Sequence, residues 1–289
     1  MRYTPDLLLK PFVFPESPRW YRDTFYFCDI DAGTIHRIGA DGTSHAVYVH
    51  GSPISGWVRL DDGSLLVVAG IERRLVSVRD GVATTFADAT GIVGWALNDL
   101  LRTPDGHCYV GGLDFNLFAD PTQTDKPSPL MHVTPDGRVA VATREIMFPN
   151  GMTLLPSGEL LVADSLSGEL LAFARGANGA LGHRRVWASL PGEMPDGISL
   201  DAEGAVWVAS HHRVLRVREG GEITDVVDMG ATRATACMLG HADGRTLLIT
   251  ASDTHDRAQI RANGPSGAVF TARVPVPGAG LPSIYGDRS

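Results

Sequence analysis

LPSGELLV, residues 155–162, is the stretch that decides the fold. Apolar residues lead into a tight polar turn at Gly158, and an apolar strand follows it, as in one hairpin of a β-sheet. The same pattern occurs six times along the chain. The other five copies are WYRDTFYF (20–27), LDDGSLLV (60–67), TPDGHCYV (103–110), DAEGAVWV (201–208) and HADGRTLL (241–248).

The spacing of the copies predicts the architecture. The turn positions Thr24, Gly63, Gly106, Gly158, Gly204 and Gly244 follow one another at intervals of 39 to 52 residues. Such an interval accommodates four short strands and is typical of the blades of a β-propeller. We therefore predict an all-β fold, a single domain over residues 1–289, with six four-stranded antiparallel blades around a central channel. An all-β sandwich would not explain six similar units.

The last copy ends after its third strand. We expect the N-terminal segment around residues 6–9 to supply the outer strand of the last blade and so to close the ring.

The composition limits the kind of partner. The chain has 44% hydrophobic and 20% charged residues, as in an ordinary globular protein, and a net charge of −8 without any run of Lys and Arg. This argues against nucleic-acid binding and against anionic membranes, and it favours a small-molecule substrate. Residues 1–6 lack a signal-like apolar segment, so we expect a cytoplasmic protein, a monomer or a weak homo-oligomer. Cys28, Cys108 and Cys237 lie singly in apolar runs and are predicted to be buried thiols.

The repeat also predicts where a site lies. In a propeller blade the innermost strand enters at the mouth of the channel, about eight residues before each turn position. The residues found there are Glu16, Ser55, Asn98, Asn150, Asp196 and Ala236. Taken singly, Asn-Gly and Asp-Gly are ordinary turn dipeptides. Carboxylates that converge on one axis are different, because they repel one another unless a cation lies between them.

We therefore predict one divalent metal ion among the side-chain oxygens of Glu16, Asn98, Asn150 and Asp196. All four side chains offer oxygen, and neither Cys nor His is present in the set. Oxygen donors favour a hard ion, Ca²⁺ first, with Mg²⁺ or Mn²⁺ as alternatives and Zn²⁺ as a less natural one.

Loops on the same side supply further candidates. Two are long, at about 113–129 and about 252–267. The first is interpreted as an apolar lid or as a simple insertion; its apolar residues are Phe115, Leu117, Phe118 and Pro121. Shorter loops offer Asp29, Asp164, Ser165, His211 and His212. Adjacent residues of an extended segment face opposite ways, so only one of the two histidines would point into the site.

Several segments together resemble the SMP-30, gluconolactonase and luciferin-regenerating-enzyme family, which includes regucalcin. They are PESPRW (15–20), FCDI (27–30), IHR (35–37), LND (97–99), FPNGM (148–152), DS (164–165), PDGI (195–198) and DAEGAVWVA (201–209). The resemblance spans almost the whole chain. It implies a six-bladed propeller, a metal held by Glu16, Asn150 and Asp196, and Asn98 near metal and substrate.

Family members typically hydrolyse lactones of sugar acids. The resemblance thus implies a metal-dependent lactonase in which Asp196 also helps to deprotonate the attacking water. Many members have an arginine two residues before the asparagine, where this chain has Ala96, and a glycine where it has Leu100. With Trp95 and Leu97 nearby, we expect a less polar substrate than gluconolactone. The residues that we assign to substrate binding are Trp95, Asn98, Asp99, Phe115, His211 and His212.

Two other functions stay open. One is a metal-assisted isomerase or cyclase on the same scaffold, and the other is a propeller that binds a metal or ligand without catalysis. The sequence has no Gly-x-Ser-x-Gly elbow, Walker loop, dinucleotide fingerprint or His-Glu-x-x-His motif that would favour another enzyme class.

Overall fold

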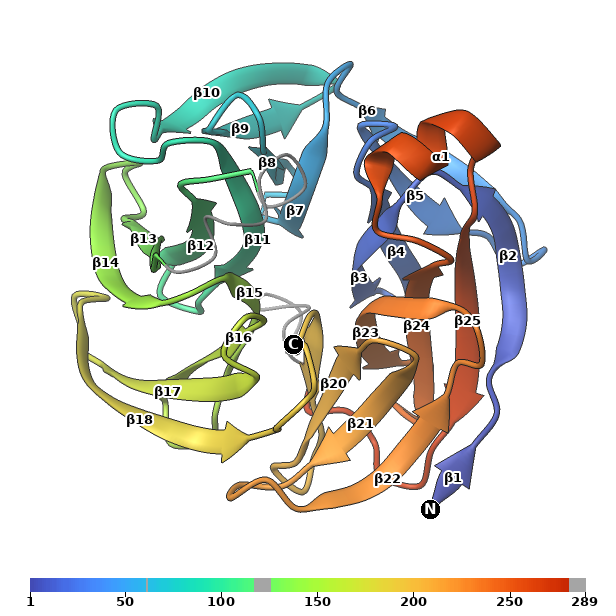
Figure 1. Ribbon diagram of the computed structural model, residues 1–289. Coiled ribbons are helices and arrows are strands. Elements are labelled where there is room, and N and C mark those ends of the chain that lie inside the picture. Colours follow the sequence, from blue (N-terminus) through green and yellow to red (C-terminus); the bar gives the residue numbers. More distant parts are fainter. Residues whose placement is uncertain (61, 117–125, 281–289) are drawn as a thin grey trace.

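The computed structural model describes residues 1–60, 62–116 and 126–280. In these residues six β-sheets form a ring around a common centre (Figure 1). Each sheet has four consecutive antiparallel strands, apart from the exchanges made by the N-terminal segment. The predicted six-bladed β-propeller is therefore confirmed.

From the innermost strand outward, the first three blades are β3 (Pro15–Tyr21), β4 (Thr24–Asp29), β5 (Thr34–Ile38) and β6 (Ser44–Val49); β7 (Ile54–Arg59), β8 (Leu65–Ala69), β9 (Arg74–Arg79) and β10 (Val82–Asp88); and β11 (Ala96–Arg102), β12 (Cys108–Leu113), β13 (Ser128–Val133) and β14 (Val139–Ile146). The next three are β15 (Pro149–Leu154), β16 (Leu160–Asp164), β17 (Glu169–Arg175) and β18 (Leu181–Ser189); β19 (Ile198–Leu200), β20 (Val206–Ser210), β21 (Arg213–Val217), β22 (Ile223–Asp228) and β1 (Arg2–Tyr3); and β23 (Arg233–Gly240), β24 (Thr246–Ser252), β25 (Gly267–Arg273) and β2 (Asp6–Phe12).

The tight turn of each repeat joins the innermost strand to the second strand. In five blades this turn has a glycine with positive φ, for example 85° at Gly158. The first blade has no glycine there, and uses Arg22 and Asp23 at φ 42° and 60° between the paired residues Tyr21 and Thr24. Two central residues with positive φ are the geometry of a two-residue hairpin turn. The first repeat therefore keeps the same hairpin without glycine.

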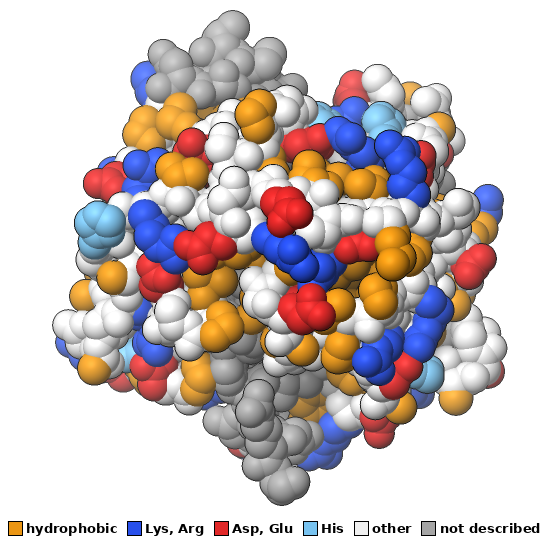
Figure 2. Space-filling model, turned by 90° about the horizontal axis from the view of Figure 1, so that it is seen from below, with side chains coloured by type: hydrophobic (Ala, Val, Ile, Leu, Met, Phe, Trp, Pro, Cys, Tyr) orange, Lys and Arg blue, Asp and Glu red, His pale blue; other side chains and the backbone are white. Residues whose placement is uncertain are grey.

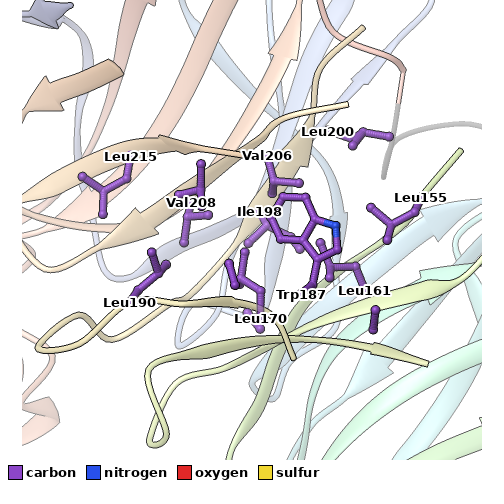
Figure 3. Packing of buried hydrophobic residues seen from close by; sticks show 14 residues of the cluster. Leu155, Leu161, Leu170, Trp187, Leu190, Ile198, Leu200, Val206, Val208 and Leu215 are labelled. Atoms are coloured by element: carbon purple, nitrogen blue, oxygen red, sulfur yellow. The ribbon is translucent and has the colours of Figure 1, made fainter. Parts of the chain in front are cut away.

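Apolar side chains fill the spaces between neighbouring blades. In the described part of the chain they form six clusters, one at each contact between two blades. Figure 3 shows the cluster between blades four and five, where Trp187 packs among Leu161, Leu170, Ile198 and Val208. Burial of one such side chain contributes about 1.5–3 kcal/mol. The ring is thus stabilised mainly by contacts between blades.

The N-terminal segment closes the ring. As predicted, β2 pairs with β25 and forms the outermost strand of the sixth blade. The cluster between the sixth and first blades contains Phe12 edge-to-face with Phe27, with ring centroids 4.8 Å apart. The sequence did not predict the parallel pairing of β1 with β22, where the Met1 ammonium group lies 3.1 Å from the carboxylate of Asp225.

The long loop at about 252–267 contains a helix that the sequence analysis did not anticipate, α1 (Arg257–Asn263). Asp256 caps it by accepting hydrogen bonds from the backbone of Ala258 and Gln259, and Gly264 ends it at φ 86°. An N-cap aspartate and a glycine eight residues later were the local pattern that could have predicted this helix.

The outer surface mixes both signs of charge. Figure 2 shows acidic and basic side chains interspersed over one side of the molecule. Neighbouring strands pair some of them, for example Arg74 with Asp88 at 3.0 Å. The part of the chain that the structure describes holds no helix long and apolar enough to cross a bilayer. The three cysteines are buried free thiols, as predicted.

Candidate metal and substrate site

Bulges shape the innermost strands where they enter the channel. The pairing of β7 with β8 skips from Ile54 to Trp57, and the equivalent skips occur from Leu97 to Leu100 in β11 and from Pro149 to Met152 in β15. A bulge frees its residues from the ladder and redirects their side chains. Each of these bulges begins with a residue found by counting back from the turns, namely Ser55, Asn98 and Asn150. In these three blades the repeat position is therefore the first residue of a bulge, whereas in the first blade Glu16 itself pairs with Cys28 and the bulge follows it.

The sixth blade departs from this count by one residue. Its bulge falls between Ala234 and Ala236 and holds Thr235 alone. Thr235 therefore takes the position that the sequence analysis assigned to Ala236. The hydroxyl group of Thr235 is fully buried and donates to the carbonyl oxygen of Pro15 at 2.7 Å, which joins the sixth blade to the first.

Residues at the repeat position line a cavity of about 770 Å³. Those that the structure brings to its wall are Glu16, Ser55, Asn98, Asn150 and Asp196, from five successive blades. They include all three residues predicted to hold a metal and the asparagine predicted beside it. We call this set the oxygen ring.

The two carboxylates of the oxygen ring affect each other. Burial is the main cause that raises the pKa of Asp196 well above its usual value, and the negative charges of Glu16 and Asp99 raise it further. A hydrogen bond from the side chain of Asn150 opposes this rise. The second carboxylate, Glu16, is buried and accepts a hydrogen bond from the backbone N–H of Ser17. A cation between these groups would relieve their repulsion.

The carboxamides of the oxygen ring are oriented in a compatible way. Nδ2 of Asn98 donates to the carbonyl oxygen of Pro149 at 3.2 Å, and Nδ2 of Asn150 donates to Oγ of Ser165 at 3.2 Å. Both amide nitrogens are thus engaged with the protein, which leaves the amide oxygens as donors to a cation. Among the described residues, no group of three or more His, Cys, Asp or Glu side chains is placed to hold a metal ion. The oxygen ring is a different kind of donor set, because it has two carboxylates and takes its other oxygens from carboxamides and a hydroxyl group. The donor set fits a hard divalent ion.

A second set of side chains lies two residues before the oxygen-ring residue of each of the first five blades, and two residues before Thr235 in the sixth. Its members are Phe14, Pro53, Ala96, Phe148, Met194 and Arg233, and all of them line the cavity. We call this set the collar. Alternate residues of a strand share one face, so counting back two further positions would have found the five members in the first five blades from sequence. Five members are apolar and one is a cation.

Short polar contacts fix the backbone at the collar. The Asp29 carboxylate accepts hydrogen bonds from the backbone N–H groups of Val13 and Phe14, at 2.8 and 2.7 Å. The Asp164 carboxylate holds Met147 and Phe148 in the same way, both at 2.9 Å. These aspartates, which the sequence placed on the mouth side, therefore position the strand entries of Glu16 and Asn150.

The comparisons with known proteins agree with this geometry. The sequence profile of the SMP-30/gluconolactonase/LRE-like family matches residues 14–253. The chain belongs to this family. A 6-deoxy-6-sulfogluconolactonase from Pseudomonas putida is 27% identical over 287 residues, which cover 96% of this chain and 97% of that protein. A pentonolactonase from Haloferax volcanii is 25% identical, over 94% of both chains. The solved structure of regucalcin from Agrobacterium tumefaciens, a calcium-binding protein, superposes with a TM-score of 0.79 at 22% identity, over 96% of both chains.

Within this SMP-30/gluconolactonase propeller, two of the residues assigned to substrate binding lie at the cavity: Trp95 and Asn98. Asp99 does not line it. The carboxylate of Asp99 lies 3.1 Å from Nη2 of Arg19 and also accepts hydrogen bonds from Oγ of Ser17 and the backbone of Leu100, so it is part of the packed channel interior.

The other predicted residues are placed as follows. Phe115 is buried and does not itself line the cavity, whereas its neighbours Leu113 and Asn116 do. Leu117, Phe118 and Pro121 of the predicted lid lie outside the described residues. Leu100, which we expected near the substrate, is fully buried in the cluster between the second and third blades.

The two histidines take different positions behind the wall. Nδ1 of His211 is 2.9 Å from Nη2 of Arg233. His212 is exposed, and its ring contacts the carbonyl oxygen of Thr232 at 3.2 Å. Neither lines the cavity, and the sequence analysis missed Arg233, the residue through which His211 reaches it.

Proposed function

We propose that this protein is a divalent-metal-dependent lactonase. The observation that carries the proposal is the oxygen ring at the wall of the cavity, with Asp196 held at a raised pKa beside Glu16. Support comes from the two full-length relatives, which are named as lactonases of sugar acids.

The ion would be held by Glu16, Asn150 and Asp196, with Ca²⁺ as the first choice for oxygen donors. When bound, a divalent ion supplies Lewis-acid polarisation of the lactone carbonyl. The residues of the chain do the rest. Asp196 accepts a proton from the attacking water.

Hydrolysis adds one water across the acyl bond. The water oxygen bonds to the carbonyl carbon, the ring oxygen leaves with a proton, and the product is a hydroxy acid. The collar places the lactone ring against apolar surface from Phe14, Phe148 and Met194. Because Ala96 presents only a methyl group at the third blade, we propose a substrate with fewer ring hydroxyls than gluconolactone on that side.

The test measures proton release from a panel of five- and six-membered lactones, both sugar-derived and alkyl. Metal-free protein receives Ca²⁺, Mg²⁺, Mn²⁺ or Zn²⁺ separately, and calorimetry measures binding of each ion. We expect metal-dependent turnover, and a fall in kcat/KM of about 10²-fold or more in Asp196→Asn, because a carboxamide cannot accept the proton. Asp31→Asn is the matched control, since Asp31 lines the cavity outside the oxygen ring.

Other outcomes assign other functions. Products of unchanged mass would indicate the isomerase or cyclase, because only hydrolysis adds water. Metal binding without turnover on any lactone would indicate a binding propeller and would contradict the proposed activity.

A further inference from the structure

Arg233 distinguishes the sixth blade from the rest of the collar. It stands at the start of β23, and it is the single Lys or Arg among the described residues that line the cavity. The ring of blades places β23 of the sixth blade opposite β11 of the third blade, which carries Ala96 (Figure 1). The cavity therefore has a cation on one wall and a methyl group at the equivalent collar position across the channel.

The guanidinium group is held in place by His211. Nη2 of Arg233 donates to Nδ1 of His211 at 2.9 Å, and the backbone N–H of Ala234 donates to the carbonyl oxygen of His211 at 2.7 Å. Arginine only donates, so this contact requires a neutral imidazole with Nδ1 as acceptor. Burial and the nearby charge of Arg233 both lower the pKa of His211, which favours that form.

The guanidinium group keeps hydrogen-bonding capacity. Its contact with His211 uses one of five N–H donors, and Nε is buried without a hydrogen-bond partner among the described residues. Arg233 thus presents a fixed donor group to the cavity.

None of the hydrogen bonds described for the carboxylates that line the cavity is made to Arg233. Asp256 accepts hydrogen bonds from Ala258 and Gln259 at the start of α1, and Asp31 is exposed. Glu16 and Asp196 belong to the oxygen ring. Within the described residues the hydrogen-bond partner of the Arg233 side chain is a neutral imidazole, so its positive charge is available for a ligand.

We propose that Arg233, positioned by His211, determines specificity by binding an anionic substituent of the lactone, such as a carboxylate or sulfonate. The inference rests on the proposed lactonase function and names its substrate class. The apolar collar residues contact the ring of the substrate, while the planar guanidinium donates paired hydrogen bonds to the anion.

The test compares two lactones that share the ring and carry either an anionic or a neutral substituent at the same carbon, γ-carboxy-γ-butyrolactone and γ-hydroxymethyl-γ-butyrolactone. In the metal-loaded protein we expect a higher kcat/KM for the acid. Arg233→Met should lower kcat/KM for the acid about 10- to 100-fold, mainly by raising KM. It should change kcat/KM for the neutral lactone less than about threefold. Arg233→Lys should restore part of the loss, since it keeps the charge but not the fork.

Two further variants test whether the preference for the acid depends on Arg233 itself or on the positive charge of this region in general. Arg213→Met removes a nearby exposed cation that pairs with Glu193 and does not line the cavity, so the preference for the acid should persist. His211→Ala should raise KM for the acid more than for the neutral lactone, because it frees the guanidinium without removing it. If Arg233→Met does not fold, Arg233→Lys and His211→Ala carry the comparison.

A second measurement keeps this inference separate from the proposed reaction. Calorimetry compares tetrahydrofuroate with tetrahydrofurfuryl alcohol, a pair that shares a ring and contains no bond to hydrolyse. Tighter binding of the carboxylate in the wild type, lost in Arg233→Met, supports the anion site even if no lactone is turned over. Turnover without preference for the acid, or a preference that survives in Arg233→Met, overturns the anion site and leaves the lactonase intact.

Discussion

Single residues of this protein take their role from the bulge that holds them. Asn98 and Asp99 are neighbours, yet Asn98 lines the cavity while Asp99 pairs with the buried Arg19. The oxygen ring could be predicted from sequence because the repeat gives the register of five blades. Arg233 could not, because the one-residue bulge at Thr235 shifts the sixth blade, and no residue pattern shows how many residues a bulge holds.

A substitution of Asp164 tests whether metal binding depends on the hydrogen bonds that hold the backbone in front of Asn150. Asp164→Ala leaves the backbone N–H groups of Met147 and Phe148 without their acceptor, and Asn150 lies two residues after Phe148. These donors are partly buried, and a buried donor left without a partner costs about 1–3 kcal/mol. We expect a loss of about 2–4 kcal/mol in the free energy of unfolding, measured in urea, together with weaker metal binding by calorimetry. Ser157→Ala, at an exposed turn of the same blade, is the control. Unchanged metal affinity in a folded Asp164→Ala protein would contradict the positioning role.

At the scale of strands, glycines serve two separate purposes. The turn glycines supply positive φ, which the sequence pattern predicts directly. Gly197 has an ordinary backbone conformation and is required by proximity, because a Cβ there would lie 2.2 Å from Cβ of Ala236 in the next blade. The innermost strands approach that closely beside Asp196. Such a contact between distant residues is not visible in the sequence, where Asp196-Gly197 reads as an ordinary turn.

Two substitutions separate these purposes. Gly158→Ala meets no atom within 4 Å but places alanine at φ 85°, so it should cost about 1 kcal/mol and leave activity unchanged. Gly197→Ala forces the fifth and sixth blades apart and should cost about 2–3 kcal/mol. It should also lower kcat/KM, because Asp196 is the preceding residue. Thermal unfolding and lactone turnover measure both effects. Equal loss of activity in the two variants would show that the strand contact has no special relation to the site.

At the scale of the whole molecule, the oxygen ring depends on closure. Its residues come from five successive blades, so their separation is fixed only when the six blades form a complete circle. Sequence predicted that the N-terminal segment completes the sixth blade, because the last repeat is short of a strand. It did not predict the parallel pairing of β1, whose two residues carry no strand pattern of their own.

Closure can be weakened at one side chain far from the cavity. Phe12 is 8% exposed and packs against Phe27 in the cluster between the sixth and first blades. Phe12→Ala should lower the free energy of unfolding by about 3–4 kcal/mol, since it leaves a cavity between these blades. Leu7→Ala, on the same strand but 49% exposed, should change it by less than about 0.5 kcal/mol. If the circle holds the oxygen ring together, Phe12→Ala should also weaken metal binding at temperatures where the protein is still folded, and Leu7→Ala should not. Metal affinity equal to that of the wild type in folded Phe12→Ala protein would show that the five blades keep their spacing without a tight closure.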